Sequence, residues 1–67
     1  MLVFQDSLAE AYQRVGAVLN KLGKASESRD LYQKALPIRQ SQTMRDPDNP
    51  AWQKNLQDVK DKLAALP

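Results

Sequence analysis

Small or apolar residues recur every three or four positions in three separate segments of the chain, which is the period of one face of an α-helix. Each segment is therefore predicted to form an amphipathic helix, and the whole chain an all-α fold. The residues of the three stripes are Phe4, Leu8, Ala11, Tyr12, Val15, Val18, Leu19 and Leu22 in the first segment, Ala25, Ser28, Leu31, Tyr32, Ala35 and Ile38 in the second, and Trp52, Leu56, Val59, Leu63 and Leu66 in the third.

Residues that interrupt regular structure mark the ends of the first two helices. The first helix, expected over about 3–22, should end near Gly23, because glycine readily adopts the left-handed conformation that closes a helix. The second helix is expected over about 25–44 and contains Pro37, which has no backbone N–H to donate. A kink at Pro37, or a looser stretch after it, is therefore expected.

The third helix has the clearest starting signal in the chain. Asn49 followed by Pro50 is typical of a capping residue with proline at the first helical position, so a helix is expected over about 50–66. The 67 residues can form only one domain, because a chain of this length buries only a thin core. The predicted domain, 1–67, is a helical hairpin followed by a helix that caps its open face.

The composition excludes most catalytic and metal-binding chemistry. The chain has no cysteine and no histidine, so thiolate nucleophiles, imidazole bases and the usual zinc ligands are missing. We therefore expect no enzyme activity, no catalytic residue, no metal and no cofactor. The net charge of +2 is too small to indicate nucleic acid. No segment resembles a signal peptide or a membrane-spanning helix, so no membrane partner and a cytoplasmic location are expected.

The third helix repeats features of the first. A shift of 48 residues places Phe4 on Trp52, Gln5 on Gln53 and Leu8 on Leu56. It also places Ala11 on Val59 and Val15 on Leu63. Because isolated repeats leave an apolar face uncovered, this correspondence predicts either the end of a longer repeat array or pairing with a second copy of the chain.

The stretch from Ala9 to about Gln42 resembles a tetratricopeptide repeat, in the long-period form found in bacteria. Small residues would let two antiparallel helices approach closely, while large ones fill the space around them. Ser28 stands where the family usually has alanine, and Gln40 where a proline normally closes the repeat. The residues that carry the resemblance are Tyr12, Val15, Gly16, Leu19, Leu22, Gly23, Ser28, Tyr32 and Ala35, and Trp52 opens the next helix.

The resemblance implies a right-handed stack of helical hairpins that holds peptides or partner domains in a concave groove. The function that it implies is a non-enzymatic protein–protein interaction module, self-associating or the terminal part of a longer array. A solvated helix face is the alternative interpretation of the same polar positions. Carried over by helix face, the groove would be lined by Glu10, Gln13, Ala17, Asn20, Lys21, Asp58, Asp61 and Lys62.

Two other kinds of three-helix domain fit the predicted layout. A small nucleic-acid-binding domain is one alternative, but its recognition helix would need clustered Arg or Lys on one face. The basic residues Arg29, Lys34, Arg39 and Arg45 are instead spread along the second helix. A domain that docks amphipathic peptides, of the kind found in trafficking proteins, is the other alternative.

Overall fold

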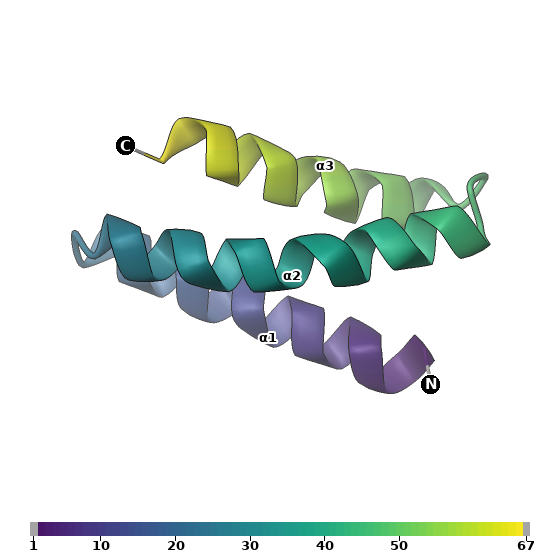
Figure 1. Ribbon diagram of the computed structural model, residues 1–67, viewed down its shortest axis with the longest axis horizontal. Helices are drawn as coiled ribbons and strands as arrows, with labels where there is room; N and C mark the ends of the chain where they lie inside the picture. Colours follow the sequence, from purple (N-terminus) through teal and green to yellow (C-terminus); the bar gives the residue numbers. More distant parts are fainter. Residues whose placement is uncertain (1, 67) are drawn as a thin grey trace.

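The computed structural model describes the backbone of residues 2–66 and the side chains of residues 6–66. The described residues form three helices, α1 (Leu2–Lys21), α2 (Ala25–Arg45) and α3 (Pro50–Ala65), and no strand (Figure 1). The prediction of an all-α fold is therefore confirmed. The helices had been expected over about 3–22, 25–44 and 50–66. The side chain of Phe4, which the first stripe includes, lies outside the described residues.

The two turns between the helices form at the residues predicted from the sequence. Gly23 has a φ of +79°, a left-handed conformation that places few demands on glycine and strains a residue with a Cβ. Asn49 caps α3, because its side-chain oxygen accepts a hydrogen bond from the backbone N–H of Trp52 at 3.2 Å. Pro37 does not end α2, which continues to Arg45.

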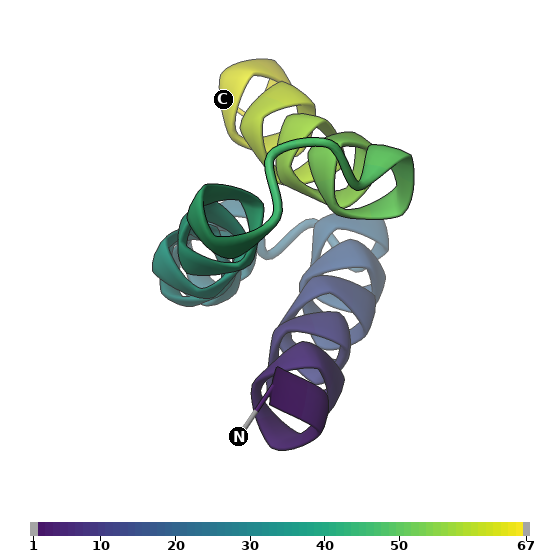
Figure 2. The same cartoon turned by 90° about the vertical axis from the view of Figure 1, so that its right-hand side faces the viewer.

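The three helices run alternately up and down, and in the view of Figure 1 α2 lies between α1 and α3. The dimensions of the molecule are 35 × 21 × 14 Å, and in the end-on view α2 lies to one side of α1 and α3 (Figure 2). α2 packs against α1 along much of its length and against α3 less extensively. Since α1 and α3 pack mainly on α2, they diverge from each other in the end-on view (Figure 2).

A close approach between α1 and α2 forms the tightest part of the core. A Cβ placed on Gly16 would lie 3.0 Å from the Tyr32 ring, so this position accepts little more than a hydrogen atom. The buried Ser28 hydroxyl donates to the backbone oxygen of Gly16 at 2.6 Å. The core comprises Ala9, Tyr32, Ala35 and Val59, with Tyr12, Leu36, Ile38, Leu63 and Leu66 partly buried against it.

Several residues predicted to face the core are exposed. The exposed fractions of Val15, Val18 and Leu22 are 51%, 56% and 65%, so their assignment to the buried stripe of the first helix was wrong. The reason is that α1 packs mainly on one neighbour, α2, through the side that carries Ala9 and Gly16. Trp52 is half-buried rather than a core residue, because it lies in the first turn of α3 at the end of the helix bundle.

Candidate functional site: a polar groove between α1 and α3

An open groove of about 390 Å³ lies between α1 and α3, and residues of α2 contribute to its lining. It is the space left because α1 and α3 both pack on α2 while diverging from each other. The two walls are largely polar, and Tyr32 supplies an aromatic ring. The lining residues are Asp6, Glu10, Gln13, Arg14 and Ala17 from α1, Tyr32 and Arg39 from α2, and Asn55, Asp58 and Lys62 from α3.

Arg39 is the buried cation of the groove, with 3% of its surface exposed. Its Nη1 donates to Oδ1 of Asp6 at 2.6 Å, forming an ion pair between α1 and α2. Its Nε donates to Oε1 of Gln13 at 2.9 Å, and Nη1 also reaches Oε1 of Gln42 at 3.2 Å. A buried charge is tolerated only when it is paired and hydrogen-bonded, and these contacts meet that requirement.

Two glutamines extend this network of hydrogen bonds. Gln42 is fully buried, and its Nε2 donates to Oδ1 of Asp6 at 3.3 Å, so the amide serves both members of the ion pair. Gln13 accepts from Arg39 and donates through Nε2 to Oδ2 of Asp58 at 3.2 Å. All three helices are thus joined through one set of polar side chains. We call Asp6, Gln13, Arg39, Gln42 and Asp58 the polar network.

The charges in the groove are balanced. Asp6, Glu10 and Asp58 provide three acidic groups, and Arg14, Arg39 and Lys62 provide three basic ones. Arg14 is already paired with Glu10 at 2.7 Å across one turn of α1, as Arg39 is with Asp6. The groove therefore offers a mixture of donors and acceptors rather than a field of one sign.

Tyr32 adds a hydroxyl whose ionisation is disfavoured. Burial of the side chain, and then the negative charge of Asp58, raise the pKa of the Tyr32 hydroxyl above its ordinary value of 10.0. The hydroxyl is consequently neutral at physiological pH and can donate a hydrogen bond to an occupant of the groove.

The structure brings together part of the residue set expected from the sequence. Glu10, Gln13, Ala17, Asp58 and Lys62 line the groove. Asn20 and Lys21 are exposed on the last turn of α1, outside the groove lining. Asp61 instead borders a second depression on α3 together with Lys54, Asn55, Gln57 and Asp58.

The buried members of the site were not anticipated from the sequence. The stripe predicted for the second helix ended at Ile38 and did not include Arg39 or Gln42. Their positions nevertheless continue its period, since Ser28, Tyr32, Ala35, Arg39 and Gln42 follow one another at steps of three and four. This regular spacing was the sequence signal from which the burial of Arg39 and Gln42 could have been predicted.

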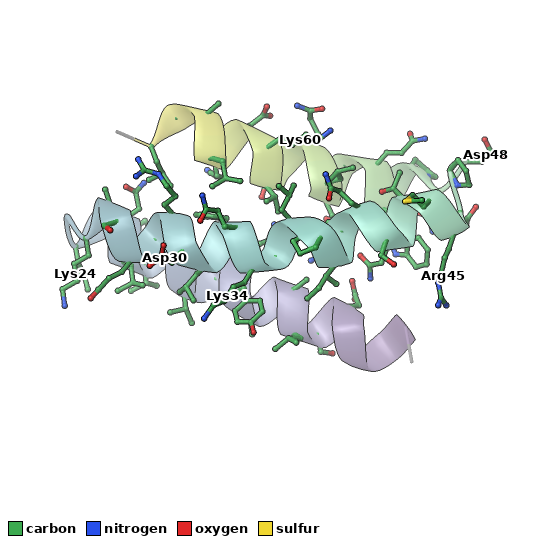
Figure 3. The ribbon with its side chains drawn as sticks, viewed as in Figure 1. Lys24, Asp30, Lys34, Arg45, Asp48 and Lys60 are labelled. Carbon is green, nitrogen blue, oxygen red and sulfur yellow. The ribbon has the colours of Figure 1, made fainter. Side chains whose placement is uncertain are left out.

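The basic residues of α2 do not form one cationic surface. Arg39 points into the groove, whereas Nζ of Lys34 lies 6.0 Å from the centre of the Tyr12 ring on α1 (Figure 3). Arg45 lies at the far end of α2, beside the connection that contains Asp48 (Figure 3). Nucleic-acid binding therefore gains no support from the placement of these side chains.

The described residues contain no group of three or more acidic side chains placed to hold a metal ion. Among the described helices, none is long and apolar enough to cross a membrane. Comparison with family models, curated proteins and solved structures finds no match to this chain. The groove itself is therefore the basis for a proposal about function.

Proposed function

We propose that this chain is a non-enzymatic protein-interaction module of the tetratricopeptide type, which binds a peptide segment of a partner protein between α1 and α3. The observation that carries the proposal is the open groove of about 390 Å³, walled by two helices that diverge and supported from below by buried side chains of α2. The spacing of Tyr12, Gly16, Tyr32 and Ala35 in the sequence supports the same proposal.

The chemistry of the groove favours a peptide of mixed polarity in an extended conformation. Gln13 Nε2 and Asp58 Oδ2 form an exposed donor and acceptor pair across the groove, 3.2 Å apart. A peptide group, which has one acceptor and one donor, can replace that bond by accepting from Gln13 and donating to Asp58. Lys62 and the Tyr32 hydroxyl add two further donors for backbone or side-chain oxygens.

A nucleic acid is a poorer fit to this groove. Phosphate backbones bind where Lys and Arg outnumber acidic groups, and here Asp6, Glu10 and Asp58 would face the phosphates. Arg14 and Arg39 are already engaged with two of those carboxylates. Binding of generic duplex DNA at low salt would contradict the proposal.

The test begins by selecting peptides that bind the intact chain from a displayed library of random peptides. A selected peptide is then titrated into the isotopically labelled chain. We expect the largest amide chemical-shift changes at Gln13, Ala17 and Asp58. The matched pair of variants is Lys62→Ala, within the groove, and Lys60→Ala, an exposed lysine of the same helix outside it. The first should weaken peptide affinity about 5-fold, as for the loss of one exposed hydrogen bond worth about 1 kcal/mol, and the second should leave it unchanged.

Two outcomes would refute the groove as the binding site. One is an equal loss of affinity in both lysine variants, which would indicate a general charge effect. The other is a set of shift changes confined to the opposite side of α1. A third variant, Ala17→Arg, fills the groove with a long side chain and should abolish binding while circular dichroism remains helical.

A further inference from the structure

The face of α1 that points away from the groove carries an apolar stripe that no other described residue covers, and the stripe continues to Leu22, just beyond the end of the helix. Ala11, Val15, Val18 and Leu22 are all exposed, and they follow one another at spacings of four, three and four. We call these four residues the outer stripe. At about 100° per residue they fall within roughly 60° of one another around the helix, so they form one narrow face.

The outer stripe is separate from both other surfaces of α1. Ala9 and Gly16, which are buried on the α2 side, lie about 140° from the centre of the outer stripe around the helix. Gln13 and Ala17, which line the groove, lie more than about 120° from it, and Arg14, at the near edge of the groove, lies about 70° from it. Single apolar residues on a surface need no explanation, but an aligned row of them marks an interaction site.

The third helical segment repeats the pattern of the outer stripe, and there the structure shows what the apolar residues pack against. The shift of 48 residues places Ala11 on Val59, Val15 on Leu63 and Val18 on Leu66. In α3 these residues are buried in the core or packed against it, where they hold α3 on the antiparallel α2. The outer stripe therefore has the pattern that this protein uses to dock one helix on another in antiparallel orientation.

The spacing of the outer stripe allows it to pair with a second copy of itself. Steps of four, three and four read the same in both directions, with the centre between Gly16 and Ala17. Two copies of α1 paired antiparallel about that centre place Val15 of one copy opposite Val18 of the other. They also place Ala11 opposite Leu22, so that a small side chain faces a large one at each end. We propose that the outer stripe is the interface of a twofold symmetric dimer of this chain.

The flanks of the outer stripe set the strength of this dimer. A twofold axis brings each flank of α1 against the same flank of its copy. On one side this joins the partly apolar flanks of Tyr12 and Leu19. On the other it brings Arg14 of one copy near Lys21 of the other, and these like charges weaken the pair. Helices that meet along about three turns bury less than about 1,200 Å², the range of weak complexes, so we expect dissociation constants of tens to hundreds of micromolar.

Sedimentation analysis of the full chain over a range of concentrations is the first test. We expect the mass to rise from 7.6 kDa toward twice that value as concentration increases. Val18→Glu places a charge at the centre of the interface and should keep the chain monomeric, with helical circular dichroism unchanged because the site is exposed. The control is Met44→Glu, on a residue 81% exposed near the end of α2, which should dimerise normally.

Single cysteine variants test the antiparallel orientation, since the chain has no cysteine of its own. A mixture of Ala11→Cys and Leu22→Cys should form a disulfide-linked heterodimer within minutes of mild oxidation. Leu22→Cys alone should not, because an antiparallel pair separates the two copies of position 22 by about 16 Å along the helices, whereas a disulfide needs Cα atoms within about 7 Å.

A monomer at every concentration would overturn the proposal, as would efficient cross-linking of Leu22→Cys with itself. The inference deepens the proposed function, since it rests on the chain being an interaction module and names a second copy as the partner of one surface. The two can fail separately, because Val18→Glu leaves the groove intact and Lys62→Ala leaves the outer stripe intact.

Discussion

Replacing Arg39 with methionine tests whether the polar network holds the three helices together. Methionine keeps the aliphatic stem of the arginine in place but removes the guanidinium, which donates to Asp6, Gln13 and Gln42. The fully buried oxygen of Gln42 then loses its donor, which costs about 1 to 3 kcal/mol. The Asp6 carboxylate is 46% exposed and remains hydrated after the substitution. Loss of its ion pair with Arg39 therefore adds only about 1 kcal/mol.

The expected total is about 2 to 4 kcal/mol of unfolding free energy. At roughly 0.05 to 0.1 kcal/mol per residue, a chain of this size has about 3 to 7 kcal/mol of stability, so Arg39→Met removes about half of it. Urea unfolding followed by far-ultraviolet circular dichroism measures the change. With a slope near 1 kcal/mol per molar urea, the midpoint should fall by about 2 to 4 M.

The matched control is Arg29→Met, a half-buried arginine of the same helix for which no hydrogen bond is described, and it should change stability by less than about 0.5 kcal/mol. Asp6→Asn retains an acceptor for Gln42 but leaves the buried Arg39 cation without its carboxylate, so it should cost at least as much as Arg39→Met. Measurements at about 1 μM, well below the expected dissociation constant of the dimer, keep dimerisation from contributing. A loss below about 1 kcal/mol for Arg39→Met would refute the reasoning, since it would mean that the network gives no net stabilisation.

Three further predictions concern single positions. Because the pKa of Tyr32 is raised by folding, the unfolded chain releases this proton first. The stability that Tyr32 contributes is complete below about pH 10 and is lost as the pH rises through its folded pKa, so the urea midpoint should fall there. Tyr32→Phe should flatten that decline and Tyr12→Phe should not, whereas an identical decline in both variants would contradict the assignment. Asn49→Ala removes the cap of α3 and should cost about 1 kcal/mol in urea unfolding, with no change expected if Trp52 N–H finds another acceptor. Trp52→Ala should cost about 2 kcal/mol, less than the 3 kcal/mol or more of a fully buried aromatic, and a larger thermal destabilisation would mean that Trp52 is better packed than its half-buried position indicates.

The helices were predictable because their signals are local. Gly23 adopts a positive φ and Asn49 caps α3 for reasons contained in a few neighbouring residues. The small residues Gly16 and Ser28 were also interpreted correctly, since their value lies in letting α1 and α2 approach closely. Local patterns of this kind specify which segments are helical and which side of each is able to pack.

The exposure of Val15 was not predictable in the same way, because it depends on how many helices pack on α1. An apolar stripe shows that a face can be buried, but the number and direction of neighbours come from the three-dimensional arrangement. The burial of Arg39 depends on partners 26 and 33 positions away in the chain, Gln13 and Asp6. A buried cation is recognised only when such partners are brought to it. Helix faces were enough to predict about half of the residues that line the groove, but not its buried cation, Arg39.

The attachment of α3 has a consequence for motion. This helix packs mainly on α2, is shorter than the other two, and is connected to α1 through the bond from Gln13 to Asp58. Cooperative units with less buried contact open at lower free energy than the whole molecule, so the amides of α3 should exchange with solvent before those of α2. Since α3 forms one wall of the groove, an occupant that contacts both walls would slow that exchange and draw the third helix into the same cooperative unit as the hairpin.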